Sequence, residues 1–331
     1  MYQSLQTITL KTGESAELGV LSGPDNSELA RELMALLGHK GEIWRWQIYQ
    51  SLTQQHAEVD SRFYILSKAG RPFANIMSVE AHGVGIFGHV YTAPDERRKG
   101  AADIIQTFQL DDFKRRGGRA LYLGTDYDTH PYRLYRKHGF QGAEHGSNYM
   151  YWFALGQERF EGDAFEISPT RHEALSFKHW PVLPALAMMK HPARIRILGM
   201  NVIGPHSTEA GALPFFAAVD KHDKGASAYV AVSEKSNLPV AIACVRPEHY
   251  FWEQSDLVDL FCAPDFESEL PGLLAHLRLP PGRNLVCYAD TFWAAKRQIL
   301  QNCGFSLSAT LKNHMLSAGK AHDVELWSRR M

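Results

Sequence analysis

The chain has 331 residues, of which 45% are hydrophobic, and its formal net charge at pH 7 is −1. This length favours two domains over one core, and the apolar fraction excludes an intrinsically disordered chain. The balanced charge argues against nucleic acid or a membrane as partner, because both attract proteins with a basic excess.

The start of the chain shows no basic segment followed by an apolar run, and no apolar stretch reaches the ~18–20 residues of a membrane span. The four cysteines lie in the second half, at positions 244, 262, 287 and 303. Their spacing fits neither a zinc site nor a small disulfide framework. We therefore expect a cytoplasmic protein with reduced thiols and no metal, either monomeric or homodimeric.

Periodicity and turn residues predict a mixed α/β domain over residues 1–155. Tight turns at 69–70 and 82–83 divide the stretch 62–92 into three strands. In chain order we expect two helices, these three strands, a helix, a strand, a helix and a strand, at residues 27–37, 43–54, 62–92, 101–117, 120–126, 130–140 and 148–155.

A polar stretch at 156–164 is the expected linker, and a second domain over 165–331 repeats the order of elements. We expect a hairpin, a strand, a helix, a strand and a helix at 228–245, 256–265, 269–279, 284–290 and 293–305. Ala-Pro-Asp at 93–95 recurs at 263–265, and Gly-Phe at 139–140 recurs at 304–305. These matches, in the same order of elements, predict a duplicated domain.

Residues 97–102, Arg-Arg-Lys-Gly-Ala-Ala, stand between an expected strand and an expected helix. The first turn of a helix has unpaired N–H groups and partial positive charge, and so suits a phosphate. Gly100 and Ala102 would let phosphate oxygens approach the backbone, and the three cations would attract them. The alternative is an ordinary solvated helix start. The Gly-x4-Gly-Lys-Ser/Thr pattern of a Walker loop is absent.

This segment resembles the pyrophosphate-binding motif of the GNAT acetyltransferase superfamily, Gln/Arg-x-x-Gly-x-Gly/Ala, with Arg97, Gly100 and Ala102 at its defined positions. Residues 134–140 resemble the superfamily's Leu-Tyr-x-x-x-Gly-Phe segment. The resemblance covers roughly 5–155 and, in weaker outline, 165–331. It implies two GNAT-like domains in tandem, each a central mixed β-sheet flanked by helices.

The resemblance implies acetyl-CoA or another acyl-CoA as co-substrate, with its diphosphate on the N–H groups of residues 98–102. The strand before the motif would hydrogen-bond the pantetheine arm. The expected cofactor-binding residues are Val90, Tyr91, Thr92, Arg97, Arg98, Lys99, Gly100, Ala101 and Ala102.

Tyr135 occupies the superfamily's general-acid position, and a phenol with a pKa near ~10 can protonate a thiolate leaving group. Its alternative role is a partly buried aromatic residue of the core. An alkylamine acceptor needs a base, for which the candidates are Glu80, His89 and Asp128, each of which could instead be structural. Asp128 replaces an Asn that the superfamily often carries there.

Counting along the second copy places Glu267, Leu270 and Gly272 at the three motif positions, and Leu300 at the position of Tyr135. The carboxylates of Glu267 and Glu269 would repel a diphosphate. The second domain is therefore expected to lack a donor site, which leaves one active site per chain.

The resulting hypothesis is an N-acetyltransferase acting on the amine of a small molecule or peptide, with no nucleic acid or membrane partner. The main alternative is a non-catalytic acyl-CoA-binding, regulatory or scaffold protein, and a third is O-acylation or decarboxylation on the same scaffold. Trp44, Trp46 and Tyr49 would line an acceptor pocket or belong to the core.

Overall fold

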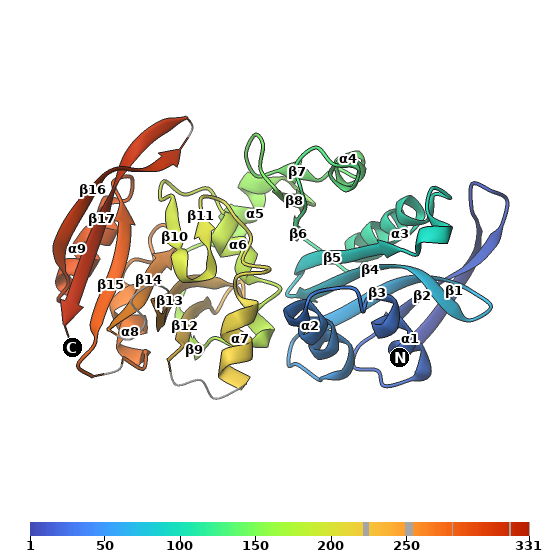
Figure 1. Cartoon of the computed structure of the whole chain (residues 1–331), viewed down its shortest axis with the longest axis horizontal. Coiled ribbons are helices and arrows are strands. Elements are labelled where there is room, and N and C mark those ends of the chain that lie inside the picture. The colour runs from blue at the N-terminus through green and yellow to red at the C-terminus, as the bar shows by residue number, and fades with distance from the viewer. Residues whose placement is uncertain (221–224, 249–253, 280, 318, 331) are drawn as a thin grey trace. The chain divides into compact units, whose positions relative to one another are not determined.

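The computed structural model describes residues 1–220, 225–248, 254–279, 281–317 and 319–330. The chain forms two compact units, Met1–Phe160 and Glu161–Met331 (Figure 1). Each unit contains a large mixed sheet flanked by helices. This confirms the predicted fold class of two mixed α/β domains in tandem.

The first unit is built on a sheet with the strand order β1-β2-β3-β4-β5-β6-β8-β7. All neighbours run antiparallel except β5 and β6. The elements are β1 (Tyr2–Thr9), β2 (Ser15–Ser22), α1 (Glu28–Leu36), α2 (Glu42–Thr53), β3 (Asp60–Lys68), β4 (Arg71–Ala81), β5 (Val84–Thr92), the short helix η1 (Pro94–Glu96), α3 (Ala101–Arg115), β6 (Ala120–Gly124), α4 (His130–Lys137), β7 (Gln141–Gly142) and β8 (Tyr149–Phe153).

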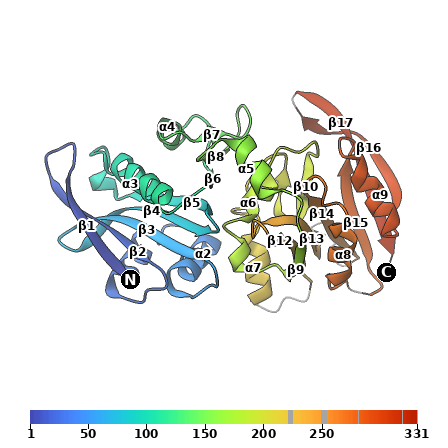
Figure 2. The same cartoon turned by 180° about the vertical axis from the view of Figure 1, so that it is seen from behind.

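Helices cover both faces of this sheet. Helix α3 lies along one face, while α1 and α2 lie on the other, as the two opposite views show (Figures 1 and 2). Ala101, Ile105 and Phe113 of α3 are buried in the sheet-facing core. Ser27 caps α1 by accepting a hydrogen bond from the amide of Ala30, as expected for a serine at this position.

The predicted meander of three strands is present. Its turns place Ala69, Gly70, His82 and Gly83 at positive φ, the backbone that two-residue hairpins require. The hairpin of β1 and β2 was not predicted, because Tyr2–Thr9 does not alternate apolar and polar residues and has no buried face.

Strands β5 and β6 pair in parallel only over Val84–Ile86 and Ala120–Tyr122. Strand β5 then continues as far as Thr92. His89 and Val90 oppose the single residue Ile76 of β4, and His89 has a φ of 48°. This is the geometry of a bulge, which bends a strand locally. The two strands therefore part beyond Ile86, and the bulge lies beside the gap in their pairing.

The second unit is built on a sheet with the order β16-β17-β15-β14-β13-β12-β9, antiparallel except between β14 and β15. A two-stranded sheet, β10 and β11, accompanies it. The elements are β9 (Thr170–Ala174), η2 (Phe177–His179), α6 (Leu183–Met188), β10 (Ile195–Ile197), η3 (Leu198–Met200), β11 (Val202–Ile203), α7 (Leu213–Asp220), β12 (Ser227–Ser233), β13 (Pro239–Pro247), β14 (Ser255–Cys262), α8 (Glu269–His276), β15 (Asn284–Asp290), α9 (Ala294–Asn302), β16 (Ser306–Ser317) and β17 (Lys320–Arg330).

Two backbone hydrogen bonds of the first unit have counterparts within the second unit. Both occur at the short sequence segments that recur along the chain. The amide of Ala93 donates to Phe73 O at 2.8 Å, and that of Ala263 donates to Val240 O at 2.8 Å. After the last helix of each motif, Phe140 N donates to Tyr135 O at 3.1 Å. In the second unit Phe305 donates to Leu300 at 2.9 Å. The two halves thus share local geometry as well as element order.

The polar segment expected to be a linker, 156–164, contains helix α5 (Gln157–Ala164), and the division between the two units falls inside it. Phe160 is buried and packs on Phe153, with ring centroids 5.2 Å apart. The guanidinium of Arg119 lies 5.7 Å from its ring centroid. One aromatic residue in a polar stretch thus anchors the helix.

Candidate donor site

The segment between β5 and α3 presents a row of unpaired backbone donors. Gly100 caps α3 with a φ of 85°, and Arg98 has a φ of 64°. Within the described part of the chain, the amides of residues 98–102 donate to no protein group. Successive free N–H groups at a helix start form an anion-binding cradle. The site has the backbone chemistry that the diphosphate of an acyl-CoA needs.

The turn between β1 and β2 covers part of this segment. The amide of Lys11 donates to Lys99 O at 3.0 Å. A Cβ added at Gly100 would lie 3.1 Å from both Cγ and Cε of Lys11. The unpredicted hairpin thus brings a fourth cationic residue to the helix start, and Gly100 leaves room for its side chain.

The predicted cations of this segment differ in their contacts. Arg97 donates from Nε to Thr92 O at 3.1 Å, and its guanidinium lies 5.8 Å from the ring centroid of Tyr91. The ammonium of Lys99 pairs with Glu14 at 2.9 Å and with Glu96 at 3.1 Å. The charge of Lys99 is therefore largely balanced by protein carboxylates.

Glu14 joins the hairpin to two lysines. Its carboxylate also accepts from Lys68 Nζ at 2.6 Å. Hydrogen bonds from Lys68 and then Lys99 lower the pKa of Glu14 to about 2. Glu14 is consequently ionised at neutral pH and places a negative charge beside the proposed diphosphate position.

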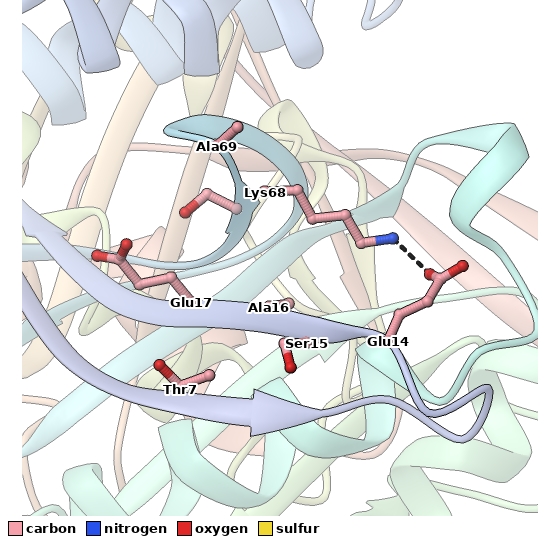
Figure 3. A pocket seen from close by; sticks show the side chains of 8 residues that line it. Thr7, Glu14, Ser15, Ala16, Glu17, Lys68 and Ala69 are labelled. Atoms are coloured by element: carbon pink, nitrogen blue, oxygen red, sulfur yellow. Dashed lines mark hydrogen bonds and ion pairs between the residues drawn. The ribbon is translucent and has the colours of Figure 1, made fainter.

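A shallow pocket of about 480 Å³ lies on the hairpin side of the sheet, and Figure 3 shows the ion pair of Lys68 and Glu14 at its edge. It is lined by Thr7, Glu14, Ser15, Ala16, Glu17, Ser67, Lys68 and Ala69. None of the predicted site residues lines it. We therefore place the candidate site at the free amides and the parting strands.

Tyr135 lies at the parting of β5 and β6. It is 6% exposed, and its ring meets that of Phe87 edge-on at 5.4 Å. Phe87 is the first residue of β5 beyond the parallel pairing. Asp103 in the first turn of α3 holds Lys137 at 2.6 Å and His138 at 2.8 Å. These pairs tie the helix of Tyr135 to the start of α3.

His89 is buried beneath α2. Its Nε2 lies 2.6 Å from Gln47 Oε1, and its ring meets Trp44 edge-on at 5.5 Å. Burial, together with the charges of Lys40 and His39, lowers the pKa of His89 to about 3. His89 is thus neutral at physiological pH and is a weak base for an ammonium substrate.

The two carboxylates proposed as bases have other partners. Glu80 is buried and accepts from Arg116 at 2.6 and 3.0 Å on the α3 side of the sheet. It pairs in register with Gly85, near the opposite end of β5 from the bulge. Asp128 is exposed, has a φ of 53° and pairs with Arg133 at 3.0 Å. These contacts favour structural roles for both residues.

Several neighbours of the bulge had no signal in the sequence. Gln47 and Asn75 are fully buried, and Asn75 Nδ2 donates to His89 O at 3.0 Å. The ring of His39 lies tilted against that of Tyr91, with ring centroids 4.3 Å apart. Of the aromatic residues expected on α2, Trp44 contacts His89, whereas Tyr49 is 48% exposed. Isolated Gln and Asn residues in apolar elements are not recognisable as site residues from sequence alone.

The corresponding helix start in the second unit is closed. The amides of Glu269 and Leu270 donate to Phe266 O and Glu267 O at 3.1 and 3.2 Å. Leu270 is fully buried, and Glu269 pairs with His172 at 2.7 Å. Since these donors are already used, the helix start of α8 differs chemically from that of α3.

The chain itself also fills the region where β14 and β15 part. Their parallel pairing ends at Leu257 and Val286. Beyond it, Asp290 Oδ2 accepts from the amides of residues 194 and 195, each at 2.6 Å. Asp259 Oδ2 accepts from Gly199 N at 2.6 Å. The segment around β10 thus lies where an extended ligand arm would otherwise pair with the strand.

Among the described residues, no cluster of three or more His, Cys, Asp or Glu side chains is arranged to hold a metal ion. No helix in the described ranges has both the length and the apolar character needed to cross a bilayer. Cys244, Cys262 and Cys287 are buried free thiols, and Cys303 is a partly buried one.

No protein-family model matches the sequence, and no curated protein sequence matches it. Solved structures do match. A proposed acetyltransferase from Acinetobacter baylyi is 17% identical over 50% of this chain and 94% of that chain, with a TM-score of 0.40. A proposed acetyltransferase from Salmonella typhimurium, solved with acetyl-CoA, is 14% identical over 49% and 94%, with a TM-score of 0.38.

The ribosomal-protein-S18-alanine N-acetyltransferase from Escherichia coli is 14% identical over 40% of this chain and 93% of that chain, with a TM-score of 0.33. Each of these matches covers half of the present chain or less. The three structures named here carry the description acetyltransferase or N-acetyltransferase.

Proposed function

We propose that the chain is an acyl-CoA-dependent N-acetyltransferase whose donor site lies in the first unit. The observation that carries this proposal is the row of unpaired amides at residues 98–102, at the start of a helix that follows the parting strand β5. A diphosphate would satisfy these donors and favour the positive end of the helix dipole. The pantetheine arm would then lie along Val90–Thr92, toward Phe87 and Tyr135.

In the proposed reaction the acceptor nitrogen attacks the thioester carbonyl, and the C–S bond breaks as the tetrahedral intermediate collapses. The thiolate takes a proton, for which Tyr135 is the proposed donor. A phenol of pKa ~10 is matched to a thiol of pKa ~8.5. Supporting this role, the Tyr135 ring lies against Phe87 at the parting of the strands.

The proposed acceptor is the amine of a small molecule or peptide. Of the three proposed bases, His89 lies nearest the strand bulge, but its low pKa makes it unsuited to accept the proton of an ammonium ion. We propose that the amine reacts from its neutral fraction or loses its proton to water. We further propose that the second unit binds no acyl-CoA, because its helix-start amides have protein partners.

The test is thiol release from acetyl-CoA by the purified full chain, with panels of alkylamines, amino acids, polyamines and peptides with free N-termini. The proposal predicts release that depends on one class of amine, with an equimolar N-acetylated product seen by mass spectrometry. Tight CoA binding without release by any amine would instead favour a non-catalytic acyl-CoA-binding protein. Absence of CoA binding would contradict both functions.

A further inference from the structure

We propose that Gln47 is a positioning residue that holds the imidazole of His89 as the tautomer protonated on Nε2. His89 Nδ1 then presents a lone pair that accepts a hydrogen bond from the attacking amine. The first part stands on the geometry of α2 and β5 alone. The second part rests on the proposed function.

The thioether of Met77 favours one orientation of the Gln47 amide. Its Nε2 donates to Ser51 Oγ at 2.6 Å and lies 3.6 Å from Met77 Sδ. Turning the amide over would set its oxygen against the thioether, which is itself only an acceptor. Because Gln47 is fully buried, water does not compensate for that loss. Oε1 therefore points toward His89.

This orientation determines which imidazole nitrogen carries the proton. Gln47 Oε1 can only accept, and it lies 2.6 Å from His89 Nε2. A hydrogen bond at this distance requires Nε2 to be the donor. In a neutral imidazole the other nitrogen is then an acceptor. His89 Nδ1 has no protein partner within the described residues.

The backbone holds His89 at the place where the reaction is proposed. The residue lies in the bulge of β5, three positions beyond the last pairing with β6 at Ile86. Its φ of 48° is uncommon for a residue with a Cβ. Asn75 Nδ2 supports this conformation by donating to the carbonyl of His89 at 3.0 Å. Such backbone strain is characteristic of functional sites.

The surrounding groups keep the ring uncharged. Desolvation is the main cause of the lowered pKa of His89, and the electrostatic effects of the nearby Lys40 and His39 add to it. The α2 residues that contact the ring, Trp44 and Gln47, carry no charge. A neutral imidazole can orient the amine by accepting from its N–H, without taking its proton.

The tautomer can be measured without any activity assay. Two-bond 1H–15N correlation spectra of the full chain, labelled at histidine, identify the protonated nitrogen, and the His89→Gln variant assigns the signal. We expect Nε2–H from pH 5 to 8 in the wild type. Gln47→Leu should give a tautomer mixture.

A matched control is Gln109→Leu, since Gln109 is an equally buried glutamine on α3. It should leave the His89 signal unchanged. A His89 signal that shows Nδ1–H, or that titrates between pH 5 and 8 in the wild type, would overturn the role of Gln47.

The second part is tested with acetyl-CoA and an amine that the thiol-release panel identifies. Gln47→Leu should lower kcat/KM for the amine about 10-fold while KM for acetyl-CoA stays unchanged. Equal kinetics in Gln47→Leu and the wild type would overturn amine positioning. Absence of turnover with every amine would overturn the proposed function and the positioning role together, whereas the tautomer result would stand.

Discussion

The side chain of Lys11 lies directly over the bare Cα of Gly100, so that a Cβ at Gly100 would approach Lys11 Cγ and Cε to 3.1 Å. The contact joins the turn of the β1–β2 hairpin to the helix start that carries the free amides. A side chain at Gly100 would therefore meet Lys11 in addition to straining the backbone.

Gly100→Ala should weaken CoA binding by at least about 10-fold, because the new methyl group meets the Lys11 side chain and the residue must keep a φ of 85°, so that the backbone carrying the free amides must shift. Isothermal titration calorimetry with CoA measures the effect. Gly117→Ala is the matched control, since Gly117 has a φ of 80° with open space around its Cβ position. Both variants should lose thermal stability through the positive φ, and Gly100→Ala at least as much as Gly117→Ala, because only its methyl group meets a neighbouring side chain. An equal effect of both on CoA affinity would place the diphosphate elsewhere.

Tyr135→Phe should lower kcat about 10–100-fold with little change in CoA affinity, because the variant cannot donate a proton to the leaving thiolate. Steady-state kinetics and calorimetry together make this distinction. Tyr132→Phe is the control, since Tyr132 lies on the same helix with the same exposure of 6%. Unchanged kcat in Tyr135→Phe would remove this phenol from the mechanism.

Glu14→Gln should tighten CoA binding several-fold at low salt. It removes an ionised carboxylate near the cradle and releases Lys99 from one of its two partners. Titrations at low and high salt measure the gain, which should shrink as screening increases. Glu17→Gln on the same hairpin should have little effect, since its carboxylate accepts from Tyr2. Weaker CoA binding in Glu14→Gln would contradict this prediction and would mean that the ion pairs of Glu14 with Lys68 and Lys99 hold residues 97–100 in their binding conformation.

Acid should destabilise the first unit through His89. Its folded pKa of about 3 lies below the ordinary ~6.5 of the unfolded chain, so the unfolded state takes up the proton first as the pH falls. Stability is then present above pH ~6.5 and declines toward pH ~3 at up to about 1.4 kcal/mol per unit. Urea unfolding at pH 7.5 and 5.0 should show about 2 kcal/mol more loss in the wild type than in His89→Gln. Equal losses would show that His89 is not desolvated.

The central elements of each unit could be predicted because their boundaries carry local signals. Turn residues such as Ala69-Gly70 and the glycines that follow α3, α4 and α9 mark where elements stop, and buried strands read as apolar runs. Strand β1 and helix α5 have polar sequences and form through contacts distant in the chain, so local patterns did not reveal them.

Only the site residues that lie within a short sequence motif could be predicted. Gly100 and Tyr135 stand in short patterns with a clear chemical reason. Lys11 and Gln47 reach the same region from other elements, and only the fold brings them there. Glu80 looked available as a lone carboxylate in an apolar strand, but its partner Arg116 follows α3, far along the sequence.

A crystal structure of the full chain with CoA tests the central claim most directly. The account predicts one CoA per chain, with its diphosphate oxygens within hydrogen-bonding distance of the amides of residues 98–102. A diphosphate bound at the start of α8, or a first unit whose 98–102 amides contact no phosphate, would contradict it.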